Sequence, residues 1–196
     1  SFRGNPDLRP EESLGWDVGI EQSLLDGLVV VDVTWFDQNL ENEIQGFGQT
    51  VRNLNGTSHR QGVELSATAE LFDGFSTTAM YTYTDATDPN GMREVRRPMH
   101  SASLSAAYTF YQGRAQLFGE VIYNGAMDDL EFINATPQTR VTLTDYVLVN
   151  IGGSFKVNET VEVYGRVENL LDERYEEVFG YNTQGRAAFA GVKARF

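Results

Sequence analysis

The sequence predicts an all-β fold, a portion of an antiparallel up-and-down transmembrane β-barrel, on three observations. Apolar and polar residues alternate with a period of two along nearly all of the chain, as in strands that have one apolar and one polar face. The alternating stretches are separated in turn by a short turn and a long polar loop. Each stretch has about the 10 residues with which a tilted barrel strand crosses a bilayer.

Four alternating segments occupy the first half of the chain. The clearest is the third, in which Val63, Leu65 and Ala67 are separated by Glu64 and Ser66. Short turns that contain glycine follow the first and third segments, whereas polar stretches follow the second and fourth. The segments are residues 14–24, 28–38, 60–71 and 75–84, the short turns are residues 25–27 and 72–74, and the long loops are residues 39–56 and 85–96.

Five further segments complete the chain. In the last one, Ala190, Val192, Ala194 and Phe196 share one face and Lys193 lies on the other. The segments are residues 101–110, 114–123, 144–155, 161–168 and 188–196, with short turns at 111–113 and 156–160 and long loops at 124–141 and 171–184. About nine strands are therefore joined alternately by turns of roughly 3–5 residues and loops of roughly 12–18. Because barrels have short periplasmic turns, the long loops should lie on the outer side.

The odd number of strands indicates that this sheet is part of a larger one. Bacterial single-chain barrels close with even numbers of strands. The sequence also starts without the charged and apolar segments of a signal peptide, which an outer-membrane protein needs for export. We therefore expect that the chain begins in the middle of a longer protein.

Aromatic and charged residues fit the same arrangement. Trp35, Tyr83 and Tyr123 lie near the outer ends of their segments, where barrels carry an aromatic girdle. Charged residues fall on the polar phase, as a barrel requires because a charge facing lipid costs up to about 2–4 kcal/mol near the midplane. They are Glu64, Glu70, Glu120, Glu162, Glu168, Arg114, Arg166, Lys193 and Arg195. A soluble β-sandwich or an adhesive barrel module is the alternative, because a face in contact with water would carry charged residues at the same alternate positions. The regular order of short turns and long loops favours the membrane barrel.

Composition excludes several classes of partner and site. The 196 residues carry a formal net charge of -13, from 28 acidic and 15 basic residues, which argues against nucleic acid because phosphate binding needs clustered Lys and Arg. The sequence has no cysteine, so disulfides and cysteine-ligated metals are excluded. No apolar run reaches the length of a membrane helix, which is about 20 residues.

The sequence also lacks catalytic and metal-binding motifs. His59 and His100 have no metal-ligand spacing, no G-x-S-x-G motif occurs, and neither histidine has an evident serine partner. We therefore expect no catalytic residue, no metal site and no cofactor. Acidic loop residues could hold calcium, but they lack EF-hand spacing, and solvated charge is the preferred interpretation. These residues are Asp85, Asp88, Asp128, Asp129 and Glu131.

Three motifs, in order along the chain, resemble those of TonB-dependent outer-membrane receptors. The opening Asn5-Pro6-Asp7-Leu8-Arg9-Pro10-Glu11 resembles their NPxLxPE strand start, Gly62-Val63-Glu64 their GvE strand, and Asn169-Leu170-Leu171-Asp172-Glu173-Arg174-Tyr175 their closing NLfDkxY segment. Residues 175–186 resemble the last loop of vitamin B12 (cobalamin) receptors, and siderophore receptors share much of this ending.

The resemblance covers residues 1–196 and implies the C-terminal part of a barrel of about 22 strands, without the plug domain that occludes such barrels. It implies TonB-energised uptake of a scarce small-molecule ligand across the outer membrane of a Gram-negative bacterium. Cobalamin or a related corrinoid is the preferred ligand, and a ferric siderophore is the alternative. Tyr175, Phe179, Tyr181 and Asn182 match the last-loop motif and are candidate ligand contacts, with loop packing as their alternative role.

The C-terminal Phe196 resembles an assembly signal. A terminal aromatic residue on an alternating strand is the feature by which the barrel-assembly machinery recognises outer-membrane proteins. The ordinary end of a sheet is the alternative interpretation. We therefore expect the barrel-assembly machinery, and the lipopolysaccharide and lipid of the outer membrane, as further partners.

Overall fold

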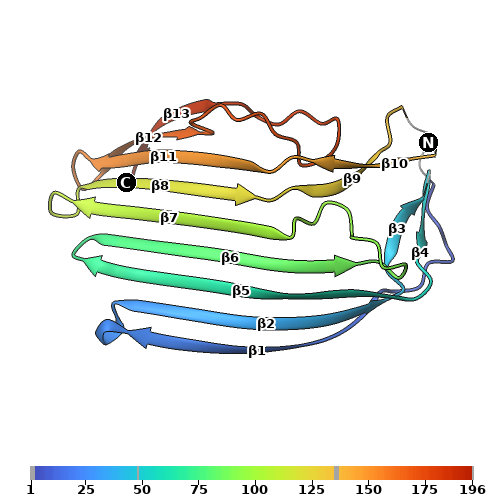
Figure 1. The fold of residues 1–196 in the computed structure, drawn as a ribbon. Coiled ribbons are helices and arrows are strands. Elements are labelled where there is room, and N and C mark those ends of the chain that lie inside the picture. The colour runs from blue at the N-terminus through green and yellow to red at the C-terminus, as the bar shows by residue number, and fades with distance from the viewer. Residues whose placement is uncertain (1–2, 48, 135–136, 196) are drawn as a thin grey trace.

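Nine strands form one curved antiparallel sheet in the computed structural model, which describes residues 3–47, 49–134 and 137–195 (Figure 1). Each strand of this sheet is hydrogen-bonded to the next one along the chain, apart from two hairpins that stand outside it. β1 and β13 are the two edges, so within the described residues the sheet is an open wall and not a closed barrel. The predicted all-β, up-and-down arrangement is confirmed.

The sheet follows the order β1-β2-β5-β6-β7-β8-β11-β12-β13. Its strands are β1 (Glu12–Leu24), β2 (Val29–Glu41), β5 (Thr57–Phe72), β6 (Phe75–Thr87), β7 (His100–Phe110), β8 (Ala115–Asn124), β11 (Tyr146–Lys156), β12 (Val161–Glu168) and β13 (Ala187–Ala194). The hairpins pair β3 (Ile44–Phe47) with β4 (Thr50–Asn53), and β9 (Met127–Glu131) with β10 (Thr139–Leu143). The described part of the chain has no helix long and apolar enough to cross a membrane.

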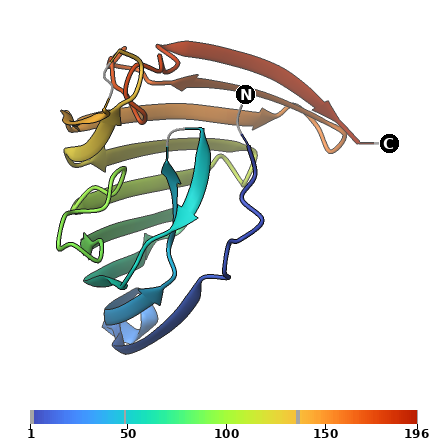
Figure 2. The ribbon, with the colours of Figure 1, turned by 90° about the vertical axis from the view of Figure 1, so that its right-hand side faces the viewer.

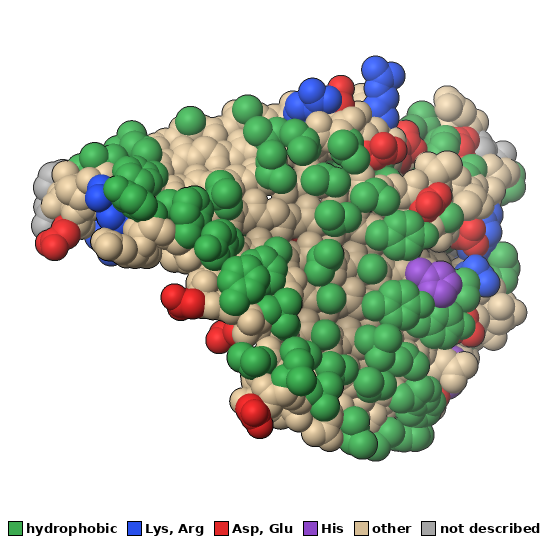
Figure 3. Space-filling view, turned by 60° about the vertical axis from the view of Figure 1, so that its left-hand side comes forward, with side chains coloured by type: hydrophobic (Ala, Val, Ile, Leu, Met, Phe, Trp, Pro, Cys, Tyr) green, Lys and Arg blue, Asp and Glu red, His purple; other side chains and the backbone are tan. Residues whose placement is uncertain are grey.

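One face of the sheet is apolar across its width. Residues that pair directly in antiparallel strands point to the same face, so the register shows which residues share it. One row across seven strands consists of Ile20, Val33, Leu65, Tyr81, Ala102, Tyr123 and Val147. Figure 3 shows hydrophobic side chains spread over this face, with the charged side chains near its margins.

The exposure of this apolar face distinguishes a membrane barrel from a soluble sandwich. Val18 is 60% exposed and Leu104 is 50% exposed, although both lie in mid-strand. In a sandwich, a second sheet would cover such side chains, and no second layer covers them among the residues that the structure describes. An apolar surface of this extent, on strands that alternate with polar residues, is typical of a barrel face that contacts hydrocarbon.

The opposite face is polar, as the alternation predicted. One row across it consists of Gly19, Thr34, Glu64, Thr82, Ser101, Asn124 and Tyr146. Arg114 departs from the predicted phase. It lies just before the first residue of β8, and its guanidinium lies 5.1 Å from the centre of the Phe155 ring. The Phe155 side chain belongs to the apolar face, because Phe155 pairs with Val163. Polar residues and charges therefore line one side of a wall that curves strongly from β1 to β13 (Figure 2).

Aromatic rings cover three glycines on the polar face. Each glycine is the direct cross-strand partner of the ring, and a Cβ in its place would collide with that ring. The pairs are Phe36 with Gly62, Phe118 with Gly152, and Tyr164 with Gly191. Glycine is needed at these positions for close approach, so the rings can lie against the wall.

The strands are joined by short connections at one end and long ones at the other (Figure 1). The short connections include the 3-10 turn Leu25–Gly27 and residues 73–74, where Gly74 has a φ of 79° and an added Cβ would meet the carbonyl oxygen of Thr109. The predicted alternation of short turns and long loops is confirmed. β13 is described as far as Ala194, and Phe196 lies outside the described residues.

Two of the four long loops are more ordered than the sequence predicted. Residues 39–56 and 124–141 were expected to be polar loops, but the first contains the hairpin β3–β4, and the second contains β9 and the start of β10, which ends at Leu143. These hairpins were missed because their strands are only four or five residues long and pair only with each other, so each is too short to show a clear alternation of apolar and polar residues. Both hairpins lie at the end of the sheet that carries the long connections (Figure 1).

Candidate ligand-binding site in the outer loops

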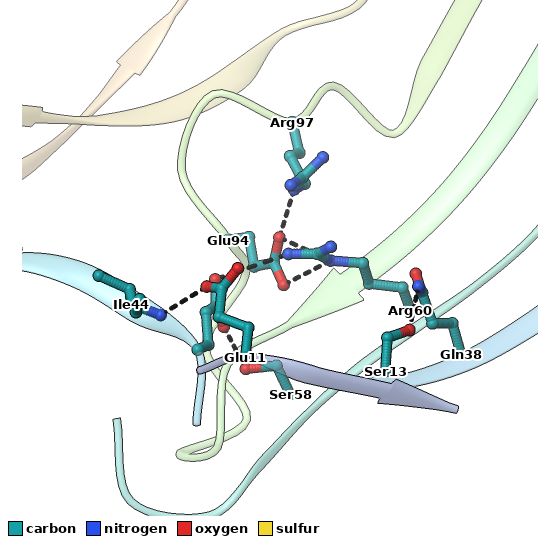
Figure 4. A network of polar contacts seen from close by, with 9 residues as sticks. Glu11, Ser13, Gln38, Ile44, Ser58, Arg60, Glu94 and Arg97 are labelled. Atoms are coloured by element: carbon teal, nitrogen blue, oxygen red, sulfur yellow. Dashed lines mark hydrogen bonds and ion pairs between the residues drawn. The ribbon is translucent and has the colours of Figure 1, made fainter. Parts of the chain in front are cut away.

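A cluster of charged residues fixes the loop between β6 and β7, residues 88–99, to the wall (Figure 4). Glu94 is buried in this loop, and both of its oxygens accept hydrogen bonds from Nε of Arg60 on β5, at 2.9 and 3.1 Å. Arg97 is bonded to the same carboxylate, and the Arg60 guanidinium also lies 3.6 Å from Glu43. Glu43 in turn accepts a hydrogen bond from the hydroxyl of Ser58.

A second buried carboxylate joins three separate outer segments. Asp129, on β9, is fully buried. Its Oδ1 accepts hydrogen bonds from Nε of Arg96 in the β6–β7 loop and from the backbone N–H of Leu130, both at 2.8 Å. Its Oδ2 accepts a hydrogen bond from the backbone N–H of Phe179, at 2.7 Å. The interpretation of Asp129 as a solvated loop charge is therefore wrong, because this side chain is fully buried and both of its oxygens accept hydrogen bonds from the protein.

The loop between β12 and β13, residues 169–186, is called the last loop below. It is closed by Asn169, whose side chain is buried at its start. The side-chain nitrogen of Asn169 donates hydrogen bonds to the carbonyl oxygens of Glu173 and Gln184, at 2.9 and 3.3 Å. Its side-chain oxygen accepts a hydrogen bond from the backbone N–H of Glu173. The backbone N–H of Asn169 donates to the side-chain oxygen of Asn150 on β11. Asn169 therefore ties both ends of the last loop to the wall.

The last loop and β10 enclose an open pocket of about 650 Å³. Three of the four predicted ligand contacts line it: Tyr175, Phe179 and Asn182. Tyr181 does not line this pocket; it is 61% exposed, and its ring centre lies 6.1 Å from that of Phe132. The other lining residues are Thr142, Leu143, Thr144, Asp172, Glu173, Arg174, Glu176, Thr183 and Gly185.

The pocket combines aromatic, amide and hydroxyl groups with an excess of negative charge. The lining residues include three acidic ones, Asp172, Glu173 and Glu176, and one basic one, Arg174. The ring of Tyr175 lies 4.3 Å from that of Tyr146, and burial followed by the charge of Glu177 raises the pKa of the Tyr175 hydroxyl. Tyr175 is therefore a neutral hydrogen-bonding group at physiological pH.

The β10 side of the pocket and the roles of Asn169 and Asp129 could not be found from the sequence. Thr142 lies on β10 and Thr144 directly follows it, where the sequence predicted the first residue of the next strand; neither was expected to line a pocket with the last loop. Asn169 was visible as part of the closing motif, but its contacts depend on the fold. Within the part of the chain that the structure describes, no group of three or more His, Asp or Glu side chains is placed to hold a metal ion.

Comparison with known proteins identifies a family. A family model described as "TonB dependent receptor-like, beta-barrel" matches residues 1–170. Similar curated proteins include the vitamin B12 transporters BtuB of Vibrio cholerae serotype O1 and of Photobacterium profundum, each 29% identical to the chain over 98% of its length. The alignments cover 31% and 32% of these relatives, so the chain spans about a third of their length.

Solved structures with the same fold include two receptors for iron compounds. The ferripyoverdine receptor of Pseudomonas aeruginosa matches with a TM-score of 0.79 and 19% identity, covering 95% of this chain and 27% of that chain. The ferric-catecholate import receptor Fiu of E. coli K12 matches with a TM-score of 0.75 and 19% identity, covering 98% and 29%. At this level of identity the likeness shows the fold alone.

Proposed function

The chain belongs to the TonB-dependent receptor family, and we propose that it forms the last nine strands and outer loops of a receptor for cobalamin or a related corrinoid. The family consists of outer-membrane β-barrels of Gram-negative bacteria that act as transporters and not as enzymes. The plug and the other strands would belong to the same longer protein. The observation that carries the proposal is the pocket, where the last loop brings Tyr175, Phe179 and Asn182 together.

Similarity in sequence supports a corrinoid, because the B12 transporters are 29% identical to the chain over 98% of its length. The siderophore receptors that share the fold support a ferric siderophore as the alternative ligand. The last-loop resemblance points to the vitamin B12 receptors.

The chemistry of the pocket supports the same choice. Cobalamin is a large ligand without a strong negative charge, and it carries many amide groups, which suit the hydroxyl, amide and aromatic groups of this pocket. Many ferric siderophores are anionic, and three carboxylates against one guanidinium would repel them. The rim of the pocket is therefore better suited to a neutral or cationic ligand.

Uptake through the complete barrel would need further partners. TonB would act on the plug, the barrel-assembly machinery would recognise the C-terminal Phe196, and lipopolysaccharide and phospholipid would surround the apolar face. None of these contacts requires covalent chemistry by this chain.

The proposal is tested by ligand binding to the full-length receptor in detergent. We expect saturable binding of cyanocobalamin that is weakened by Phe179→Ala and by Tyr175→Ala, because both rings line the pocket. Tyr111→Ala, which removes an exposed ring from a short turn at the opposite end of the strands, is the matched control and should bind normally. Binding of ferric enterobactin or ferripyoverdine in place of cyanocobalamin would favour the siderophore alternative.

A further inference from the structure

We propose that Asp129 is a positioning residue that couples the β6–β7 loop to the last loop and thereby holds the last-loop side of the pocket in place. The effect on ligand binding rests on the proposed function, whereas the coupling of the two loops does not. The inference depends on one carboxylate that is shared by two segments about 80 residues apart in sequence, a separation read from Arg96 and Phe179.

The two oxygens of Asp129 are divided between the two loops. Oδ1 accepts from the Arg96 guanidinium, and Oδ2 accepts from the N–H of Phe179, a residue that lines the pocket. Hydrogen bonds to a charged acceptor are about twice as strong as neutral ones. The position of the Phe179 backbone therefore depends on a charge that Arg96 compensates.

Neighbouring contacts make the junction continuous. The N–H of Arg96 donates to the carbonyl oxygen of Asp128, at 2.7 Å, so the β6–β7 loop is bonded to β9 through its backbone as well. The guanidinium of Arg96 lies 6.0 Å from the centre of the Phe132 ring, which faces Tyr181 of the last loop. A Cβ at Gly180 would collide with Ile133, so the last loop also packs closely on the segment after β9.

Burial makes the junction sensitive to its charge. Asp129 is fully buried, whereas Arg96 has 43% of its side chain exposed. Removal of Arg96 would leave a buried carboxylate without its ionic partner, which is strongly unfavourable, and the structure would relax by opening around Asp129. A change in the β6–β7 loop should therefore reach the last loop, although Arg96 itself is bonded to Asp129 and not to Phe179.

Hydrogen exchange in the full-length receptor tests the coupling without a ligand. We expect the peptide that spans residues 176–184 to exchange about tenfold faster in Asp129→Asn, because the Phe179 N–H loses its charged acceptor. The same peptide should also exchange several times faster in Arg96→Gln. The double variant should be no faster than the faster single variant, because both changes disrupt one junction.

Asp128→Asn is the matched control. The Asp128 side chain bonds to Arg140 and Thr142 of β10, and not to the last loop. This variant should leave exchange of residues 176–184 at the wild-type rate. Unchanged exchange in Arg96→Gln, or effects of the two single variants that multiply in the double variant, would overturn the proposal.

Ligand dissociation separates this inference from the proposed function. We expect cyanocobalamin to dissociate faster from the Asp129→Asn and Arg96→Gln variants than from the wild type. The unfolding temperature of the barrel should be the same in all three proteins. Failure of the wild type to bind cyanocobalamin would defeat the proposed function and leave the exchange result standing. Normal dissociation in both variants would defeat the link between the junction and the pocket.

Discussion

The wall and the outer loops of this protein are held together in different ways. In the wall, nine strands are paired in the same antiparallel way. Successive side chains within a strand point alternately to the apolar and the polar face, so the place of a residue in its strand determines its environment. In the loops, three buried polar side chains, those of Glu94, Asp129 and Asn169, make most of the long-range contacts described above. The difference shows that stability is distributed along the wall and concentrated at a few residues in the loops.

A charge on the lipid face should have the largest effect. Val121→Arg places a cation in mid-sheet, between Leu104 and Val149, and should lower the free energy of unfolding by about 2–4 kcal/mol. Ser105→Arg at the same level is the control, because Ser105 lies on the polar face opposite Glu120. Heat-modifiable gel migration of the full-length receptor reports folding, and equal losses in both variants would contradict the assignment of faces.

Crowding at a glycine on the polar face should have the next largest effect. In Gly152→Ala, the new methyl group meets the Phe118 ring and lies 2.8 Å from the carbonyl oxygen of Gly165, which should cost about 1–3 kcal/mol. Gly119→Ala, where the nearest atom is 3.8 Å away, should be close to neutral. Unfolding in urea with detergent measures both variants, and similar losses would show that the contacts of the ring do not matter.

Loss of the Asn169 side chain should act on the last loop and not on the wall. Asn169→Ala leaves the Glu173 and Gln184 carbonyl groups without a donor and should cost about 1–2 kcal/mol of local stability. We expect faster proteolysis within residues 169–186 at an unchanged unfolding temperature. Asn158→Ala removes an equivalent cap from a short turn at the other end, and this control should leave the last loop resistant.

An exposed ion pair on the polar face should have the smallest effect. Arg166 lies 2.9 Å from Glu168, and both side chains are more than a third exposed. Arg166→Gln should therefore lower the free energy of unfolding by less than about 1 kcal/mol. A larger loss, measured by the same urea titration, would mean that this pair is shielded from water in the complete barrel.

The comparison between wall and loops also explains what the sequence could predict. Each of the nine strands was visible because lipid on one side and water on the other impose alternation, as at Leu65 beside Glu64. The hairpins β3–β4 and β9–β10 were not visible, because their strands are only four or five residues long and pair only with each other. Tyr175, Phe179 and Asn182 were found from a motif, whereas the burial of Asp129 depends on Arg96 and Phe179, which are distant in sequence.

The most direct test of the account is to measure which face of the wall contacts lipid. These 196 residues contain no cysteine, so a single spin label can be attached at one introduced cysteine in this part of the receptor, after any cysteine elsewhere in the full-length protein has been replaced. We expect labels at positions 65, 121 and 149 to collide with oxygen dissolved in the membrane, and labels at positions 64, 105 and 150 to collide with a nickel chelate in water. The reverse pattern, or equal accessibility of both sets to the chelate, would contradict the account.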